Sequence, residues 1–132
     1  MSLRFGTDGV RGVANTELTP TFALALGAAV VDAFDTTQVV IGVDTRRSGS
    51  MLAAAVSAGV ASAGADAIEL EVIPTPAVAR EARVRNCPGV MVSASHNAFQ
   101  DNGLKVFGPG GQKLSDAEQS RIESTIMAIL TT

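Results

Sequence analysis

Residues 39–72 read VVIGVDTRRSGSMLAAAVSAGVASAGADAIELEV and contain, in order, the signals of a strand, a helix and a second strand. The β-branched run Val39–Ile41 is typical of a short strand that is buried on both faces. Ser48 stands where it would cap a helix, and apolar residues then recur every three or four positions until a stop at Gly64. Apolar and polar residues alternate over 66–72, which is the period of a strand.

The same alternation of strands and helices continues in both directions along the chain. Thr19-Pro20 and Thr75-Pro76 each pair a capping residue with a proline, which favours the start of a helix. Ser115–Glu118 is a capping box before a last helix. Val90–Val92 and Leu104–Phe107 are further strand candidates. This order predicts an α/β fold, a layered α/β/α domain with a mixed, largely parallel sheet.

The last helix carries an apolar stripe that is expected to face inward. Its members are Ile122, Ile126, Ile129 and Leu130. Met127 lies about 100° further round the helix than Ile126, at the edge of the stripe. We expect Met127 and the end of this helix to be exposed, as part of a surface that would meet a further domain.

Composition indicates one domain over residues 1–132, in which 46% of residues are hydrophobic and 17% are charged. The formal charge is −3, and the chain has no basic block, Trp or Tyr, which argues against a nucleic-acid partner. Cys87 is the only cysteine, which suits a reducing compartment. The sequence shows neither a leader pattern nor an apolar stretch long enough to span a bilayer. We therefore expect a cytoplasmic protein with no membrane partner.

The segment Ser93–Asn97 follows the expected strand Val90–Val92 and contains the only histidine of the chain. Ligands of parallel sheets lie at the carboxyl ends of strands, where this segment is expected. Its polar side chains are compatible with a plain turn. A serine hydrolase is a second interpretation, but Ser95 and His96 would point in opposite directions in extended chain, and no G-x-S-x-G elbow is present. In the third interpretation Ser95 carries a phosphoryl group, close to the ammonium of Lys105.

Four stretches, in this order, resemble the α-D-phosphohexomutases, and the chain is similar to the N-terminal domain of that family. They are Phe5–Gly12 (FGTDGVRG), Gly42–Gly49 (GVDTRRSG), Pro74-Thr75-Pro76, and Ser93–Asn97 (SASHN) followed by Asp101–Lys105 (DNGLK). The family usually has proline after the Ser-His-Asn triplet, whereas this chain has Ala98. Without a fixed φ the loop is expected to be softer, and the chemistry is expected to survive.

The resemblance implies a role for each residue of this group. Ser95 would be the catalytic phosphoserine, and an oxygen of its phosphate would ligate Mg²⁺ in the assembled enzyme. Lys105 would neutralise the transferring group or help to move the hydroxyl proton, and Arg11 would bind near the same centre. His96 and Asn97 would shape the loop and contact the phosphate or the sugar.

The implied reaction moves a phosphoryl group between the 6- and 1-positions of a hexose phosphate, through a hexose bisphosphate. Family members have four domains and this chain matches the first, so the missing domains are expected partners and the chain alone is expected to be inactive. Residues 5–12 and 93–97 are most similar to phosphoglucosamine mutases. Phosphoglucomutase and phosphomannomutase stay open, as does a non-catalytic domain that binds a phosphosugar or a partner chain. Asp44 and Arg46 are expected to hold their loop beside the site.

Overall fold

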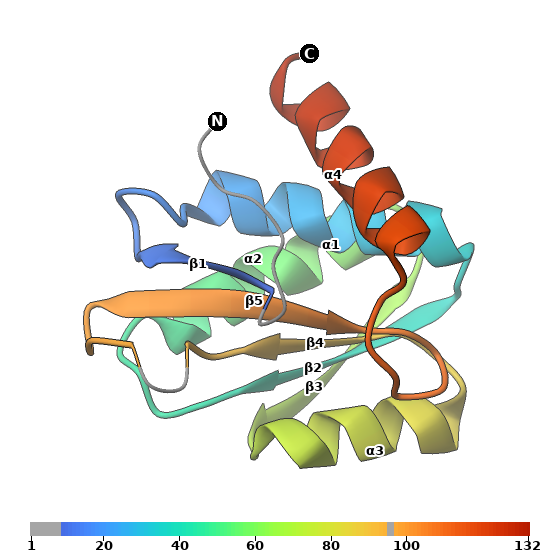
Figure 1. Cartoon of the computed structure of the whole chain (residues 1–132), viewed down its shortest axis with the longest axis horizontal. Coiled ribbons are helices and arrows are strands. Elements are labelled where there is room, and N and C mark those ends of the chain that lie inside the picture. Colours follow the sequence, from blue (N-terminus) through green and yellow to red (C-terminus); the bar gives the residue numbers. More distant parts are fainter. Residues whose placement is uncertain (1–8, 95–96) are drawn as a thin grey trace.

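The computed structural model of the protein describes residues 9–94 and 97–132 and shows a central sheet with helices on both faces (Figure 1). In chain order the elements are β1 (Val10–Val13), α1 (Pro20–Phe34), β2 (Gln38–Val43), α2 (Gly49–Ser62), β3 (Asp66–Val72), α3 (Thr75–Arg85), β4 (Gly89–Val92), β5 (Asp101–Phe107) and α4 (Asp116–Leu130). None of the described helices has the length and apolar character needed to cross a bilayer.

The sheet has the strand order β1-β5-β4-β2-β3. Strand β2 pairs in parallel with β3 and β4, whereas β5 is antiparallel to β4 and to β1. All strands except β5 therefore run in the same direction, which confirms the predicted mixed, largely parallel sheet. The strand β1 was not predicted, because its glycine and arginine give Val10–Val13 no clear strand period.

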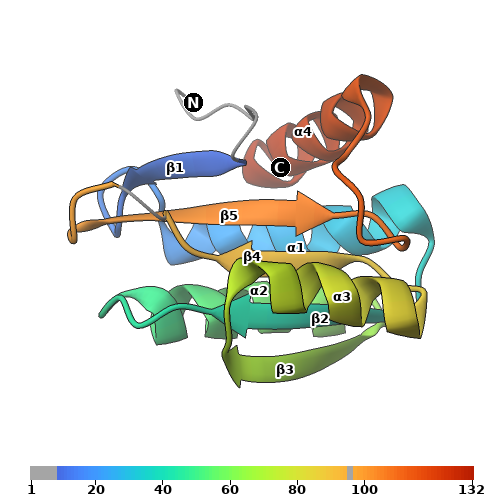
Figure 2. The ribbon, with the colours of Figure 1, turned by 60° about the horizontal axis from the view of Figure 1, so that its bottom comes forward.

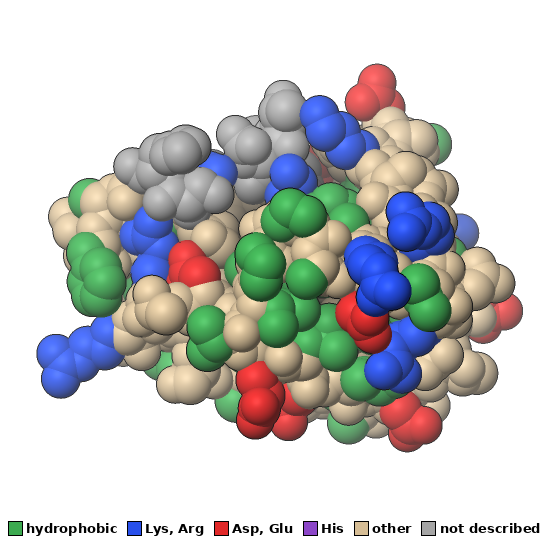
Figure 3. Space-filling model, turned by 90° about the horizontal axis from the view of Figure 1, so that it is seen from below, with side chains coloured by type: hydrophobic (Ala, Val, Ile, Leu, Met, Phe, Trp, Pro, Cys, Tyr) green, Lys and Arg blue, Asp and Glu red, His purple; other side chains and the backbone are tan. Residues whose placement is uncertain are grey.

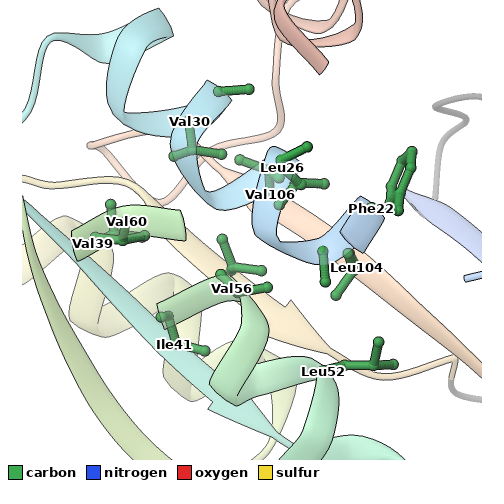
Figure 4. Close-up of a cluster of buried hydrophobic side chains, with 14 of the residues drawn as sticks. Phe22, Leu26, Val30, Val39, Ile41, Leu52, Val56, Val60, Leu104 and Val106 are labelled. Atoms are coloured by element: carbon green, nitrogen blue, oxygen red, sulfur yellow. The ribbon is translucent and has the colours of Figure 1, made fainter. Parts of the chain in front are cut away.

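The helices divide the core into two layers. Helices α1 and α2 cover one face of the sheet and α4 packs on α1, whereas α3 covers the other face (Figures 1 and 2). Val39 and Ile41 of β2 belong to the larger cluster, under α1 and α2, and Val40 belongs to the smaller one, under α3. Successive side chains of a strand point to opposite faces, so this short run supplies both layers. Figure 4 shows the larger cluster, with side chains from α1, α2, β2 and β5.

Helices α1 and α2 approach each other closely enough for their backbones to touch. A Cβ atom on Gly59 would overlap the carbonyl oxygen of Leu24 and lie 2.8 Å from its carbonyl carbon. A Cβ atom on Gly27 would likewise overlap the carbonyl oxygen of Val56. Each helix thus offers a glycine where the other backbone crosses it.

Two of the four predicted helix caps, Thr19 and Ser115, are present, whereas Ser48 and Thr75 do not cap their helices. The Thr19 hydroxyl accepts a hydrogen bond from the amide of Phe22 at 3.1 Å, and the Ser115–Glu118 capping box is complete. Ser48 is the residue before α2, but it has helical dihedral angles and its side chain makes no capping bond to the described helix. Its hydroxyl oxygen instead accepts a hydrogen bond from Asn102 Nδ2 at 2.9 Å. The Ser48 hydroxyl, which the local sequence pattern assigned to capping α2, therefore binds Asn102, a residue distant in the sequence.

Two boundaries also differ from the sequence prediction. Helix α3 begins at Thr75 itself, and Pro74 occupies the capping position. Strand β5 begins at Asp101 rather than at Leu104, because residues 101–103 pair with β1. The extension cannot be recognised in the sequence without knowledge of that pairing.

Helix α4 buries only part of its expected stripe. Ile122 and Ile126 are buried and Leu130 packs against the larger cluster, but the Ile129 side chain is 37% exposed. The inward assignment of Ile129 is therefore wrong, because the buried stripe runs through Ile122, Ile126 and Leu130, and Ile129 lies about 100° away from Leu130 around the helix axis. Met127 is 39% exposed, which confirms the expectation for that residue.

The face that carries α3 shows exposed apolar side chains with arginines beside them. In Figure 3 hydrophobic side chains gather over the middle of this face, and basic side chains lie to their right. Val72, at the end of β3, and Val84, in α3, are both 62% exposed.

Candidate functional site

The residues of interest gather at the edge of the sheet where β1, β2 and β4 end and β5 begins. Arg11 of β1 stands opposite Gly103 of β5. On the other side of β5, the amide of Ser93 donates a hydrogen bond to the carbonyl oxygen of Gly103 at 2.9 Å. The loop after β2 joins them, because the amide of Asp44 donates to the carbonyl oxygen of Val92 at 3.1 Å. Segments far apart in the sequence thus meet at the edge predicted to bind ligands.

Gly103 is the point where these segments come closest. A Cβ atom at this position would lie 2.7 Å from the carbonyl oxygen of Ser93, 3.0 Å from that of Val10 and 3.1 Å from Cγ of Arg11. The absence of a side chain therefore leaves room for the stem of Arg11 across β5.

Arg11 and Asn97, two of the residues singled out in the sequence, are in direct contact. The guanidinium Nη1 of Arg11 donates to Oδ1 of Asn97 at 2.8 Å. Nδ2 of the same amide donates to a carboxylate oxygen of Asp101 at 3.2 Å. The amide is oriented by charge, with its oxygen toward the cation and its NH₂ group toward the anion. Asn97 therefore links the guanidinium of Arg11 to the loop that precedes β5.

A second charged group is centred on Asp44 and Arg46 in the loop after β2. Nε of Arg46 lies 3.2 Å from Oδ2 of Asp44, and the hydroxyl of Ser93 donates to the same oxygen at 2.7 Å. The other carboxylate oxygen accepts the backbone amide of Arg46 at 3.0 Å. In this last bond the aspartate side chain binds the backbone amide two residues later, which is a common turn arrangement. The D-x-R spacing indicates it in the sequence.

Asn102 is a residue that the sequence interpretation treated only as part of a motif. It is fully buried, its Nδ2 donates to the hydroxyl oxygen of Ser48 at 2.9 Å, and its Oδ1 accepts the amide of Gly103 at 2.9 Å. The side chain thereby connects the first residues of β5 to the start of α2. A buried amide with both ends bonded fixes the relative position of the elements that it joins.

Lys105 lies further along β5, opposite Met91 of β4. Its Nζ atom is 5.4 Å from the centroid of the Phe107 ring, within the range of a cation–π contact. Phe107 is at the end of β5 that leads away from Gly103. The ammonium group of Lys105 therefore contacts Phe107, at the end of β5 away from the edge that carries Arg11 and Asn97.

Ser95 and His96, which carry the main chemical hypothesis, lie outside the described residues, as does Asp8. Their neighbours on both sides are described: Ser93 and Ala94 follow the end of β4, and the amide of Asn97 donates to the carbonyl oxygen of Ala94 at 2.9 Å. Within residues 9–94 and 97–132, no group of three His, Cys, Asp or Glu side chains is placed to hold a metal ion.

Comparisons with known proteins agree on one family. Residues 2–131 match the family model described as phosphoglucomutase/phosphomannomutase, alpha/beta/alpha domain I. Phosphoglucosamine mutase from Mycobacterium ulcerans is 53% identical over 135 residues, which cover 97% of this chain and 30% of the relative. The Mycobacterium leprae phosphoglucosamine mutase is also 53% identical, over 96% of this chain.

A solved structure has the same fold. The putative phosphomannomutase from Thermus thermophilus superimposes with a TM-score of 0.86 at 30% identity, over 96% of this chain and 30% of that one. The present chain thus spans about 30% of the length of the relatives that it matches.

Proposed function

Because the chain belongs to the phosphoglucomutase/phosphomannomutase family, as its α/β/α domain I, we propose that it is the phosphoserine-bearing part of a hexose-phosphate mutase. Ser95 is the residue proposed to carry the phosphoryl group. The observation that supports this most directly is the match over residues 2–131, which spans the segment 93–97, together with 53% identity to phosphoglucosamine mutase. Glucosamine phosphate is therefore the favoured substrate, ahead of glucose and mannose phosphates.

The proposed reaction is a pair of phosphoryl transfers. The bond between phosphorus and the Ser95 oxygen breaks as phosphorus bonds to a hydroxyl oxygen of the hexose phosphate. The proton of that hydroxyl passes to a base, and the released serine oxygen takes up a proton. The resulting hexose bisphosphate reverses its orientation in the site and returns its other phosphoryl group to the serine. Such transfers depend mainly on positioning and on neutralisation of the phosphoryl oxygens.

The described side chains are suited to that task in different ways. Arg11 is held in place by the amide of Asn97 at 2.8 Å and would neutralise charge on the phosphoryl group. Asn97 would then act through Arg11 as well as on the sugar or phosphate, and His96 would complete the contact with them. Lys105 would have to leave the ring of Phe107 to reach the transferring group. Each of these roles is part of the proposal.

Magnesium would be held only in part by this chain. A phosphate on Ser95 would supply one oxygen, and Mg²⁺ is normally bound by carboxylates together with phosphate. The described residues offer no cluster of such carboxylates. We therefore propose that the other magnesium ligands, and the groups that recognise the sugar, come from further domains of a mutase that acts in the cytoplasm.

A domain exchange tests this function. The segment of the M. ulcerans phosphoglucosamine mutase that matches this chain is replaced by residues 1–132, and interconversion of glucosamine 6-phosphate and glucosamine 1-phosphate is measured with Mg²⁺ and a bisphosphate activator. We expect turnover, one phosphate mapped to Ser95, and a loss of at least about 10³-fold in Ser95→Ala. Ser120→Ala, which changes an exposed serine of α4, is the matched control.

Other results would point elsewhere. Full activity in Ser95→Ala would exclude this serine as the carrier. An inactive exchange protein that still binds the phosphosugar would favour the non-catalytic binding domain. Turnover with glucose or mannose phosphates at a higher kcat/KM would reassign the substrate. The 132-residue chain by itself is expected to give no turnover and to bind Mg²⁺ weakly.

A further inference from the structure

The side chain of Arg46 reaches away from its own loop and binds the backbone that precedes β5. Nη1 donates to the carbonyl oxygen of Ala98 at 2.7 Å and to that of Asp101 at 3.2 Å. Nη2 donates to the carbonyl oxygen of Asn97 at 3.2 Å. The side chain is only 9% exposed. One guanidinium, itself largely closed to water, therefore binds three carbonyl groups of the turn 97–101, of which that of Ala98 is exposed.

Asp44 completes the arrangement by binding the other flank. Its carboxylate pairs with Nε of Arg46 at 3.2 Å and accepts the Ser93 hydroxyl at 2.7 Å. The described backbone on both sides of residues 95 and 96 is thus attached to the same ion pair, which belongs to the loop between β2 and α2. Ser93 is held through its hydroxyl, and residues 97–101 are held through their carbonyl groups.

We propose that Arg46 and Asp44 are positioning residues that set the location of the loop carrying Ser95. The step from loop placement to catalysis rests on the function proposed above, whereas the clamp itself rests on the contacts of Arg46 and Asp44. The clamp acts on the loop backbone, so neither residue needs to touch the substrate. One of the carbonyl groups that the clamp binds belongs to Ala98, a residue without a fixed φ.

The chemistry of the clamp requires an arginine. Guanidinium presents five N–H donors in a rigid plane, so it can bind several carbonyl groups and a carboxylate at once. Lysine is a single charged point on a flexible stem and would replace only part of these bonds. The carbonyl groups of Asn97 and Asp101 are bound in partly buried positions, so water compensates them only in part when they lose their donor. Arg46→Ala should therefore release the turn, and Arg46→Lys should have an intermediate effect.

The first test measures the turn directly in the 132-residue chain, by amide hydrogen exchange. The reporters are the amides of Asn97 and Asp101, which donate within the turn region to Ala94 and Ala98 at 2.9 and 3.0 Å. In Arg46→Ala we expect their exchange to accelerate at least about tenfold, while amides of β4 keep their rates. Arg47→Ala, which changes the exposed neighbouring arginine, should leave both sets unchanged.

Two results of this test would overturn the clamp. One is exchange of the Asn97 and Asp101 amides at the original rate in Arg46→Ala. The other is equal acceleration of all amides, which would make Arg46 a contributor to global stability only. If Arg46→Ala does not fold, Asp44→Asn and Arg46→Lys replace it, and the same local acceleration is required of them, smaller in Arg46→Lys.

The second test uses the exchange protein described above and separates kcat from KM. Loss of the clamp should lower kcat at least about tenfold with KM for the hexose phosphate nearly unchanged, because it removes loop placement rather than substrate contacts. Partial rescue is expected in Arg46→Lys. Unchanged kcat in Arg46→Ala, or a change confined to KM, would refute the catalytic part of the proposal. An exchange protein that is inactive before any substitution would instead count against the proposed function, and the hydrogen-exchange result would still decide the clamp.

Discussion

The crossing of α1 and α2 makes a sharp prediction for Gly59. In Gly59→Ala the new Cβ atom would lie 2.8 Å from the carbonyl carbon of Leu24 and 3.0 Å from the amide nitrogen of Ala28. Ordinary contacts of a Cβ atom begin at 3.4 Å and the new atom would overlap the carbonyl oxygen of Leu24, so the helices must separate by more than about 1 Å. The atoms in the way belong to the backbone of α1 and cannot rotate aside. The larger core cluster lies under both helices and would loosen with them.

Two opposing terms determine the size of the effect. Alanine is favoured over glycine within a helix by about 1 kcal/mol. Overpacking costs about 1–3 kcal/mol where side chains can adjust, and a clash with rigid backbone belongs at the upper end or beyond it. We therefore expect Gly59→Ala to lower the free energy of unfolding by about 2 kcal/mol. For a chain of this length that corresponds to a decrease in Tm of about 8 °C.

The assay is urea denaturation monitored by circular dichroism, and the control is a substitution at the preceding position, Ala58. Ala58 is exposed on α2, so Ala58→Gly reports helix propensity without a clash and should cost about 1 kcal/mol. Both substitutions should destabilise although they change helix propensity in opposite directions. A Gly59→Ala protein as stable as the original chain, or more stable, would refute the reasoning from backbone contact.

Three further predictions concern other parts of the molecule. Asn102→Ala removes the acceptor of the Gly103 amide in a buried position and should cost about 1–3 kcal/mol by chemical denaturation; a loss below about 0.5 kcal/mol would contradict the linking role. Burial raises the pKa of the Cys87 thiol, so the stability that depends on its neutral form is complete at neutral pH and decreases once the pH exceeds about 8.5, where the unfolded thiol ionises. The stability difference between the original chain and Cys87→Ala should therefore change above that pH, and a pH-independent difference would be inconsistent with it. The exposed side chains of Met127 and Ile129 should promote self-association of the 132-residue chain, measured by sedimentation, which Met127→Lys should reduce; a strictly monomeric original chain at high concentration would count against it.

The interactions that determine local structure were readable in the sequence. Two helix starts were predicted from local pairs, Thr19 with Pro20 and Ser115 with Glu118. This was possible because a capping side chain binds backbone amides only two or three residues away. Val39–Ile41 identified a doubly buried strand because the run is apolar at every position. The family, too, was visible in ordered motifs spread over most of the chain.

The candidate site was only partly visible in the sequence, because its contacts join distant segments. Arg11 and Asn97 were both singled out, but their hydrogen bond spans 86 positions and depends on β1 lying beside β5. Arg46 was singled out with Asp44 in the sequence, but its bond to the Ala98 carbonyl spans 52 positions, so no local pattern indicates that partner.

The tertiary structure also reversed some local preferences. Ser48 has the chemistry of a helix cap, yet its hydroxyl accepts a hydrogen bond from Asn102, which arrives from another strand. Ile129 continues an apolar helical pattern, yet it stays partly exposed because the packed face of α4 runs through Ile122, Ile126 and Leu130. The sequence alone therefore predicted the helices, the strands other than β1, and the family, although it missed the first residues of β5. The strand order and the partners of each polar side chain were decided by packing, since those contacts exist only after distant segments have been brought together.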